Sequence, residues 1–262
     1  MFDNWVPYHR QDGSTVVGDV RVFAGVESWQ LGNRRDLIAC LPPSYHDGDS
    51  RYPVLYLQDG QNLFDAATSY SGEWHVDETM LALAPEGIEA IVVGIPNAGE
   101  GRTAEYLPDQ QGRHYIDFLA GTVKPLVDAS LRTRPGRADT GLGGSSLGGM
   151  ISLYGLFARP DVFGFAAVLS PAFALAQESI MNFVAAAPTV AARIWLDVGD
   201  SEFEPWVSPR YVDSVAQMHD LLRAKGYGDN NLRFVVDRGA RHEEAAWAHR
   251  FPQAVRFLFS HS

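Results

Sequence analysis

The sequence is poor in the features that disulfide-bonded, metal-clustered and membrane-spanning proteins require. Among its 262 residues there is a single cysteine, Cys40, so neither an intrachain disulfide nor a zinc site built from several cysteines can form. Cys40 lies within the apolar stretch 37–41, and we therefore expect a buried, structural thiol. No apolar run approaches the length of about 18 residues that predicts a membrane-spanning helix. Because residues 1–5 also lack the basic and apolar regions of a signal peptide, we expect a soluble, cytoplasmic protein.

Positive charge is also scarce. The 21 Lys and Arg residues are outnumbered by 32 Asp and Glu residues, which leaves a formal net charge of −11 at pH 7. Such a surface repels phosphate backbones and anionic lipids, so we expect neither a nucleic acid nor a membrane surface as a partner. With 46% hydrophobic and 20% charged residues, the composition excludes disordered, collagen-like and coiled-coil proteins and is typical of a globular chain.

Short apolar runs alternate with helix-length amphipathic segments from residue 52 onward. The runs are nearly continuous, which is typical of strands buried on both faces of a parallel sheet. We predict strands at 54–57, 90–95, 141–143, 165–169, 194–198 and 232–236. Between and after them we predict helices at 73–84, 114–130, 147–158, 176–187, 209–225 and 244–259.

The segment 15–41 has strand-like runs but no helix between them, which predicts an antiparallel edge on the sheet. The predicted fold class is therefore α/β. We expect one domain over residues 1–262, with a mostly parallel central sheet, antiparallel N-terminal edge strands and helices on both faces. The long polar segment 97–113 contains several glycines, and we predict a short covering loop there.

The sharpest chemical signal is the Gly-x-Ser-x-Gly pattern centred on Ser146. It follows a predicted strand and precedes a predicted apolar helix, which is the context of a nucleophile elbow, a tight turn that presents a catalytic serine. Residues two before and two after such a serine must be small, and Gly144 and Gly148 meet this demand. The N–H of Leu147, at the start of the helix, would then point towards an oxyanion.

The same turn allows simpler interpretations. It could be a glycine-rich connection in which the serines only cap the helix. Ser145 is a competing nucleophile, but it lacks the symmetric glycine flanks of Ser146. A P-loop is excluded because no Lys-Ser or Lys-Thr pair follows, and a dinucleotide fingerprint is excluded because Ser146 occupies its third glycine position.

A catalytic serine needs a base, and in this fold class the chain order is serine, acid, histidine. Of the eight histidines, His242 lies in the loop between the last predicted strand and the last predicted helix, where the base is required. His219 and His249 fall within predicted helices, and His261 lies in the tail. We therefore predict His242 as the base, against the alternative of a structural histidine.

The acid is expected in the loop that follows the strand 194–198. Four carboxylates lie in or near this loop: Asp197, Asp200, Glu202 and Glu204. Glu202 is placed to reach back towards His242, and we predict it as the acid, with Asp200 as the second candidate. The alternative for all four is a solvated acidic loop.

The second oxyanion donor is expected in the loop after the strand 54–57. Gly60 would let the backbone approach a substrate there, and we predict the N–H of Gln61 as the donor, unless the stretch is only a tight turn. Four aromatic residues could line an acyl or sugar pocket or merely pack the loops: Trp74, Tyr106, Phe203 and Trp206.

With these residues in place, the chain resembles an esterase family of the α/β-hydrolase superfamily that includes esterase D and the feruloyl, acetylxylan and enterochelin esterases. The resemblance runs from about Arg35 to Phe259 and rests on the elbow together with stretches in the same order: YPVLYLQDGQNLFD (52–65), GEW (72–74), PDVFG (160–164), LSP (169–171), LDVG (196–199) and RHEEAAW (241–247). It implies an α/β-hydrolase fold with Ser146 as nucleophile, His242 as base and Glu202 as acid.

We therefore expect a serine carboxylic-ester hydrolase that acts through an acyl-enzyme on small or carbohydrate-linked esters. Two alternatives stay open. One is the same chemistry on a trilactone siderophore or with an acyl acceptor other than water, and the other is a catalytically idle hydrolase fold used as a binding module. The expected partner is an ester substrate, and no cofactor or metal is expected, because the chemistry needs none and the run His242-Glu243-Glu244 has no second histidine at helical spacing.

If His242 is the base, ester hydrolysis should become faster as the pH rises and the imidazole loses its proton. The initial rate on a short-chain p-nitrophenyl ester, corrected for spontaneous hydrolysis and measured between about pH 5 and pH 8, tests this expectation. A flat rate across that range would count against His242.

Overall fold

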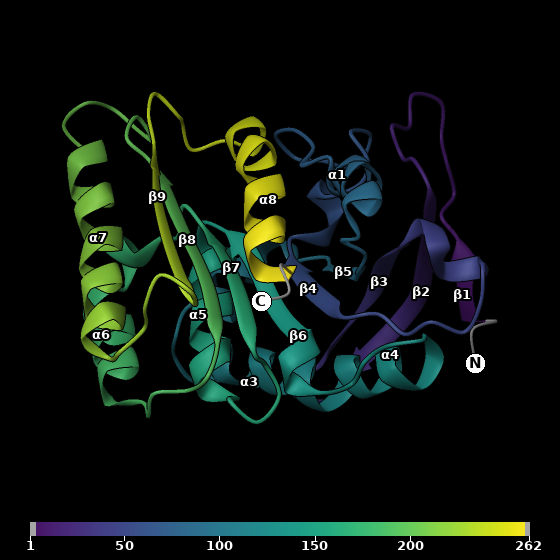
Figure 1. Cartoon of the computed structure of the whole chain (residues 1–262), viewed down its shortest axis with the longest axis horizontal. Helices are drawn as coiled ribbons and strands as arrows, with labels where there is room; N and C mark the ends of the chain where they lie inside the picture. Colours follow the sequence, from purple (N-terminus) through teal and green to yellow (C-terminus); the bar gives the residue numbers. More distant parts are fainter. Residues whose placement is uncertain (1–3, 260–262) are drawn as a thin grey trace.

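Nine strands form one sheet in the computed structural model, which describes residues 4–259. Their order across the sheet is β1-β2-β3-β5-β4-β6-β7-β8-β9 (Figure 1). The strands are β1 (Trp5–Pro7), β2 (Asp19–Ser28), β3 (Asn33–Leu41), β4 (Val54–Gln58), β5 (Ile91–Ile95), β6 (Thr140–Ser145), β7 (Phe165–Leu169), β8 (Arg193–Gly199) and β9 (Leu232–Asp237).

The first three strands differ from the others in direction. β1, β2 and β3 pair antiparallel, and β3 joins β5 antiparallel, whereas the pairs from β5 to β9 are parallel. Every residue of β4, β5, β6 and β7 is buried, as continuous apolar runs predict for a sheet covered on both faces. The predicted fold class is confirmed. β1, which the sequence analysis did not predict, extends the antiparallel edge.

Most helices lie where the amphipathic segments predict them. They are α1 (Val76–Leu83), α2 (Arg102–Tyr106), α3 (Gln110–Phe118), α4 (Lys124–Ser130), α5 (Leu147–Ala158), α6 (Gln177–Ala186), α7 (Ser208–Ala224) and α8 (Glu244–Phe259). The helix predicted at 114–130 begins at residue 110, and a π-helical turn at Leu119–Val123 divides it into α3 and α4.

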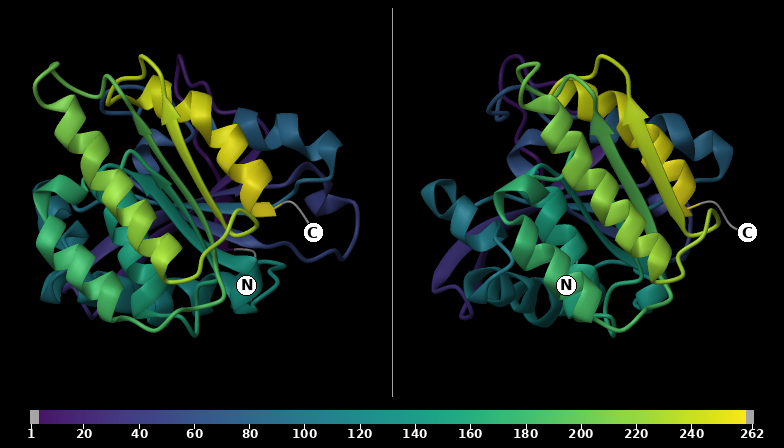
Figure 2. Two further views of the ribbon diagram at one scale, coloured as in Figure 1. Left: turned by 60° about the vertical axis from the view of Figure 1, so that its left-hand side comes forward. Right: turned by 90° about the vertical axis from the view of Figure 1, so that its left-hand side faces the viewer.

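Helices cover both faces of the sheet (Figures 1 and 2). α1 and α8 contact each other on one face, and α3, α5, α6 and α7 lie on the other. Each face has its own apolar core: Met80 and Phe251 belong to the core under α1 and α8, and Phe118, Leu153 and Val215 belong to the core on the opposite face. Because both faces are filled with apolar side chains, polar functional groups can gather only at the strand ends, where the loops emerge.

The segment 97–113, predicted as a loop, is largely helical. It contains a 3-10 turn (Gly99–Gly101), α2 and the start of α3. Glu105 in α2 forms a buried ion pair with Arg35 of β3 at 2.8 Å, and Asp109 caps α3 by accepting a hydrogen bond from the Gln111 N–H at 2.9 Å. The polar residues that suggested a loop therefore anchor and cap helices.

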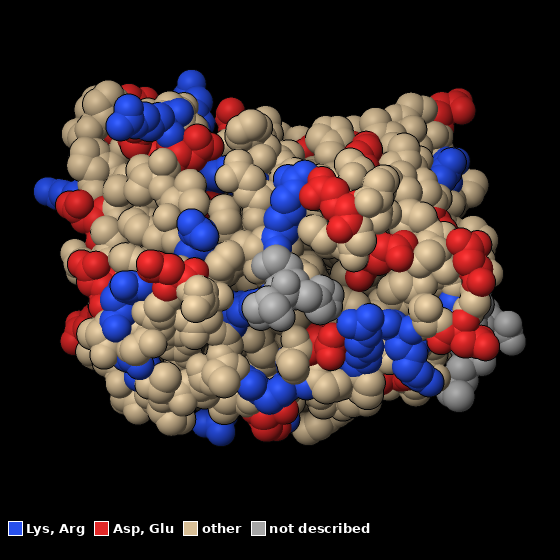
Figure 3. Space-filling view, in the orientation of Figure 1, with Lys and Arg blue, Asp and Glu red and all other residues tan. Residues whose placement is uncertain are grey.

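The surface seen in Figure 3 carries acidic and basic side chains among uncharged residues rather than a continuous field of one sign. The net charge of −11 is therefore not gathered into one acidic patch on this face. Within residues 4–259, no helix has both the length and the apolar character needed to cross a bilayer.

The Arg35–Glu105 pair should contribute strongly to stability. The two side chains are only 5% and 3% exposed, and the guanidinium donates two hydrogen bonds to the carboxylate, at 2.8 and 3.0 Å. Arg35→Met should lower the free energy of unfolding by about 3–5 kcal/mol, because it leaves the Glu105 charge buried without its partner. Urea denaturation measures the loss.

The exposed pair between Arg256 and Glu86 provides the control for this measurement. Arg256→Met should lower the free energy of unfolding far less than Arg35→Met does, since solvent screens an exposed ion pair. An equal decrease in the free energy of unfolding in the two variants would show that the buried Arg35–Glu105 pair contributes no more to stability than the exposed pair.

Candidate active site

The chain turns sharply between β6 and α5, and Ser146 lies at the turn. Its backbone adopts φ 55° and ψ −125°, an uncommon and strained conformation for a residue with a side chain. A Cβ at Gly144 would lie 2.9 Å from the carbonyl carbon of Gly148, and a Cβ at Gly148 would lie 3.0 Å from Gln58 Cβ. Steric crowding therefore excludes a side chain at Gly144 unless the backbone moves, and it disfavours one at Gly148, where Gln58 would have to shift.

Ser146, His242 and Glu202 follow one another within hydrogen-bonding distance. Ser146 Oγ is 2.9 Å from His242 Nε2, and His242 Nδ1 is 2.5 Å from Glu202 Oε2. The three residues follow β6, β9 and β8, whose carboxyl ends meet at one edge of the sheet. A hydroxyl, an imidazole and a carboxylate in this order can activate the hydroxyl as a nucleophile.

The carboxylate of Glu202 is fully buried but well supplied with hydrogen-bond donors. Its Oε1 accepts hydrogen bonds from the Gly199 N–H and from Ser170 Oγ, both at 2.5 Å. Burial by itself raises the pKa of this carboxyl group, but the hydrogen bonds with His242, Ser170 and Gly199 outweigh it and hold the pKa below its usual value. Glu202 is therefore ionised at neutral pH, where it can stabilise an imidazolium.

The other candidate acids have different surroundings. Asp200 accepts hydrogen bonds from the Gly239 N–H at 2.7 Å and from a neighbouring serine hydroxyl at 3.0 Å. Asp197 is fully buried in β8, and Glu204 is exposed. Among these four carboxylates, Glu202 is the one that the structure brings to His242.

Three aromatic rings surround the imidazole of His242. The Phe203 ring stacks on it with the ring centroids 4.7 Å apart, and the rings of Tyr211 and Trp247 meet it edge-on at 5.5 and 5.0 Å. These contacts restrict rotation of the imidazole, so that Nε2 stays directed at Ser146.

The two predicted oxyanion donors lie at turns on the same edge of the sheet. Leu147 is the first residue of α5, and the first N–H groups of a helix have no acceptor within that helix. Gln61 lies in the 3-10 turn Gly60–Asn62, close after β4. Because β4 and β6 are parallel neighbours, both turns emerge at the carboxyl ends of these strands.

Asp59 links the turn after β4 to the elbow and to α2. Its carboxylate accepts hydrogen bonds from Arg102 Nε and Nη2 at 2.7 and 2.8 Å and from Asn97 Nδ2 at 2.6 Å. A Cβ at Gly148 would lie 3.3 Å from Asp59 Oδ2, so this carboxylate packs against the first turn of α5. The segment 97–113 is therefore held beside the elbow by an ion pair.

The four aromatic residues predicted to line a pocket fall into two pairs. Trp74 and Tyr106 are only 3% and 0% exposed and belong to the apolar cores. Their burial favours packing, the second of the two interpretations, over contact with a substrate. Phe203 and Trp206 are 42% and 74% exposed and stay candidates for substrate contacts.

A hollow of about 720 Å³ lies beside the candidate acid. Its lining residues come from the loops after β8 and β9: Ser201, Glu202, Phe203, Glu204, Pro205, Val207, Gly239 and Arg241. The hollow borders Glu202 and the Phe203 ring that stacks on His242, but its lining includes neither His242 nor Ser146.

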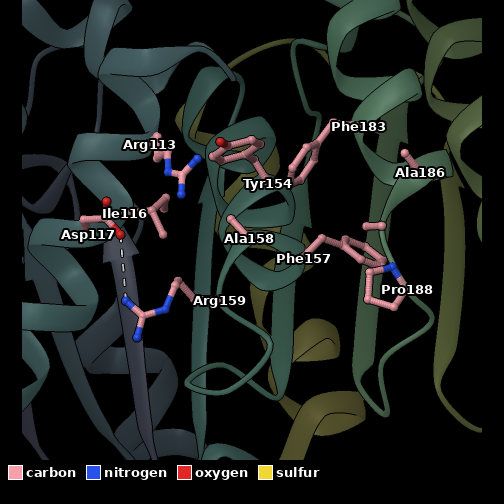
Figure 4. Close-up of a pocket in the computed structure, with 11 residues that line it drawn as sticks. Arg113, Ile116, Asp117, Tyr154, Phe157, Ala158, Arg159, Phe183, Ala186 and Pro188 are labelled. Atoms are coloured by element: carbon pink, nitrogen blue, oxygen red, sulfur yellow. Dashed lines mark ion pairs between the residues drawn. The ribbon is translucent and has the colours of Figure 1, made fainter.

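A second hollow, of about 350 Å³, lies between α3, α5 and α6 (Figure 4). The rings of Tyr154 and Phe183 meet on one side of it with centroids 4.4 Å apart, and Arg113 and Ile116 of α3 lie opposite. Its α5 residues lie in the second half of that helix, whereas Ser146 precedes the first turn. The hollow is therefore separate from the candidate active site.

One group in the described part of the chain has ligand atoms close enough to hold a metal ion. Glu73, His75 and Glu78 lie at the start of α1, and each offers an atom within 4.8 Å of the other two. His75 Nδ1 is 3.2 Å from Glu78 and 3.6 Å from Glu73, which fits ordinary ion pairs equally well. Within residues 4–259, none of the three forms a hydrogen bond or an ion pair with Ser146, His242 or Glu202, and we assign the group no part in the reaction.

Two residues next to the candidate acid are not predicted from the sequence as functional groups. Ser170 follows β7 and contacts Glu202 through its hydroxyl, and Arg250 of α8 contacts that hydroxyl at 2.6 Å. The LSP stretch at 169–171 was noted only as part of a resemblance. Arg250 carries no local signal, because its burial depends on partners far away in the sequence.

The mostly parallel sheet, the helices on both faces and the elbow between strand and helix define an α/β-hydrolase fold. The chain belongs to the family described as "Putative esterase", which it matches over residues 28–258. Membership in this family supports ester hydrolysis as the activity.

Several known proteins are similar to this chain over most of its length. The uncharacterized protein YbbA of Bacillus subtilis is 24% identical over 245 residues, which cover 88% of this chain and 94% of YbbA. An endo-1,4-beta-xylanase/feruloyl esterase of Xylanibacter ruminicola is 25% identical over 215 residues, which cover 80% of this chain but 26% of that longer protein. The crystal structure of an IroE-like serine hydrolase from Shewanella oneidensis superposes with a TM-score of 0.71 at 19% identity, covering 92% of this chain and 80% of the other.

The contact between Glu202 and His242 leads to a prediction about kcat. Glu202→Gln should lower kcat by about 10³–10⁴-fold, because a neutral amide cannot stabilise the imidazolium and can favour the wrong imidazole tautomer. Steady-state hydrolysis of a p-nitrophenyl ester measures the change. Asp200→Asn is the matched control and should keep nearly the full kcat. If only Asp200→Asn loses most of its kcat, Asp200 rather than Glu202 is the acid.

Proposed function

We propose that the chain is a serine ester hydrolase that works through an acyl-enzyme, with Ser146 as nucleophile, His242 as base and Glu202 as acid. The observation that carries the proposal is the series of contacts from Ser146 Oγ to His242 Nε2, 2.9 Å, and from His242 Nδ1 to Glu202 Oε2, 2.5 Å. The strained backbone of Ser146 and the membership in an esterase family support it.

In the first half of the reaction, Ser146 Oγ attacks the carbonyl carbon of the ester while His242 Nε2 takes the hydroxyl proton. The carbonyl oxygen becomes an oxyanion, which the N–H groups of Leu147 and Gln61 stabilise by hydrogen bonds. The bond from the carbonyl carbon to the alcohol oxygen then breaks. The alcohol leaves with the proton from Nε2, and the acyl group stays on Ser146.

In the second half, a water molecule attacks the acyl carbon and passes a proton to His242 Nε2. The same two N–H groups stabilise the second oxyanion. When the bond to Ser146 Oγ breaks, the proton returns to this oxygen and the carboxylic acid leaves. Glu202 stays ionised throughout and stabilises the imidazolium that forms in each half.

For the substrates, we propose small or carbohydrate-linked esters. The exposed ring of Phe203 and the hollow beside Glu202 offer an open, partly apolar surface next to the base, and Trp206 adds a second exposed ring in the same loop. The sequence similarity to an endo-1,4-beta-xylanase/feruloyl esterase supports an ester attached to a carbohydrate.

Two neighbouring serines test the proposal. Ser146→Ala should lower kcat for a short-chain p-nitrophenyl ester by about 10⁵–10⁶-fold, because no other group can form the acyl-enzyme. Ser145→Ala should stay active, since Ser145 ends β6 and it is the hydroxyl of Ser146 that lies 2.9 Å from His242 Nε2. If Ser145→Ala is the inactive variant instead, the nucleophile lies one residue earlier.

A fluorophosphonate probe provides an independent measurement. It should label the wild-type chain on Ser146, as located by mass spectrometry of the peptides, and it should not label Ser146→Ala. If the wild type is neither labelled nor faster than spontaneous hydrolysis on acyl-chain, sugar-ester and trilactone panels, the hydrolase proposal fails and a binding module becomes the better interpretation.

A further inference from the structure

Arg250 is a buried cation behind the proposed acid that the reaction steps do not use. Its side chain is only 2% exposed. The guanidinium donates hydrogen bonds to Asp197 Oδ1 at 3.0 Å, to Asp237 Oδ2 at 3.3 Å and to Ser170 Oγ at 2.6 Å. It therefore joins α8 to the ends of three neighbouring strands, directly behind Glu202.

The Ser170 hydroxyl lies between Arg250 and Glu202. It is 2.6 Å from Arg250 Nη2 and 2.5 Å from Glu202 Oε1. A guanidinium can only donate and an ionised carboxylate can only accept, so the hydroxyl must accept from Arg250 and donate its proton to Glu202. Hydrogen bonds in such a series polarise one another, and the arginine thereby strengthens the bond that reaches the acid.

The two oxygens of Glu202 have different partners as a result. Oε1 accepts from Ser170 Oγ and from the Gly199 N–H, each at 2.5 Å, which leaves Oε2 for His242 Nδ1. Arg250 Nη2 also lies 4.0 Å from Oε1, where its charge favours the ionised carboxylate. This arrangement selects the one rotation of the carboxylate that faces the imidazole.

The backbone of Ser170 is held in place for this contact. Its φ of 38° is uncommon for a residue other than glycine and persists only where the surroundings enforce it. Tyr211 Oη donates a hydrogen bond to the Ser170 carbonyl at 2.7 Å, and the Ser170 N–H donates to the Asp197 carbonyl at 3.0 Å. Both sides of the residue are therefore fixed by neighbouring elements.

We propose that Arg250 is a positioning residue: through the Ser170 hydroxyl it holds the Glu202 carboxylate ionised and turned towards His242. The inference rests on the proposed function. Arg250 touches neither the nucleophile nor the base, so its loss should lower kcat with little change in KM. In a purely structural role, Arg250 would only neutralise Asp197 and Asp237, and its loss would lower stability without changing the kcat of the folded protein.

A double-mutant cycle tests whether Arg250 acts through Ser170. Ser170→Ala removes the hydroxyl, and Arg250→Lys keeps a positive charge beside Asp197 but loses the planar fork that also reaches Ser170. Each variant should lower kcat about 10–100-fold, since a small misplacement of catalytic groups costs about this much. The double variant should lose no more than the larger single loss, because both changes interrupt the same path.

Two further variants serve as controls. Ser170→Gly also lacks the hydroxyl but accommodates the φ of 38°, so it should match Ser170→Ala if the hydroxyl rather than the backbone matters. Ser28→Ala removes another buried serine hydroxyl, which contacts Gln30 at the end of β2, and should keep the full kcat. Urea denaturation of every variant establishes the folded fraction for which kcat is calculated.

The inference is overturned if folded Ser170→Ala or Ser170→Gly keeps the wild-type kcat, or if the two single losses multiply in the double variant. Should Arg250→Lys fail to fold, the two Ser170 variants decide alone. Ser146→Ala, assayed alongside, separates the two proposals. If it is inactive while the Ser170 variants are fully active, only the positioning role fails. If Ser146→Ala is as active as the wild type, the proposed function itself fails.

Discussion

The buried charge of Glu202 is the constraint on which the rest of the candidate site depends. A carboxylate removed from water is tolerable only when hydrogen bonds replace its solvation. The donors here are the Gly199 backbone, the Ser170 hydroxyl and the His242 ring, which belong to the end of β8, the end of β7 and the loop after β9. The acid can therefore be ionised only where these segments meet. Because His242 is one of its donors, the orientation of this proposed base follows from the solvation of the Glu202 carboxylate.

The parallel part of the sheet provides this meeting point. β6, β7, β8 and β9 are parallel neighbours, so their carboxyl ends deliver Ser146, Ser170, Glu202 and His242 to one edge. The steric limits at Gly144 and Gly148 hold Ser146, the proposed nucleophile, at its turn, and the aromatic rings around His242 hold this proposed base. Phe203 and Trp206, the exposed candidates for substrate contact, lie in the loop after β8, which also carries Glu202. Because the Phe203 ring stacks on His242, a change at Phe203 would also affect the proposed base, whereas Trp206 is 74% exposed and, within the described part of the chain, forms no ring contact with His242.

Much of the fold follows from local patterns, but not all of it. Continuous apolar runs predicted the parallel strands, because only a sheet covered on both faces accommodates them, and amphipathic periodicity predicted α5 to α8 within one or two residues. The segment 97–113 was misjudged because glycines and polar residues are typical of loops. In this segment Glu105 pairs with Arg35, which is 70 residues away, and Arg102 pairs with Asp59, which is 43 residues away. No local sequence pattern indicates such pairs. The sequence left the places of Trp74 and Tyr106 open for a related reason, since an aromatic residue in a core and one in a pocket look the same in sequence.

By itself, the sequence determined the features that depend on neighbours along the chain: the elbow at Ser146, whose glycine flanks answer a local steric demand, and the chain order of serine, acid and histidine that singled out His242. Tertiary structure alone decided which of four nearby carboxylates contacts that histidine, and it brought Ser170 and Arg250 behind Glu202 from 32 and 48 residues away. The physical reason is that the solvation of a buried carboxylate is set by whichever donors surround it in space. Those donors come together only when the strands have paired and α8 has packed across them.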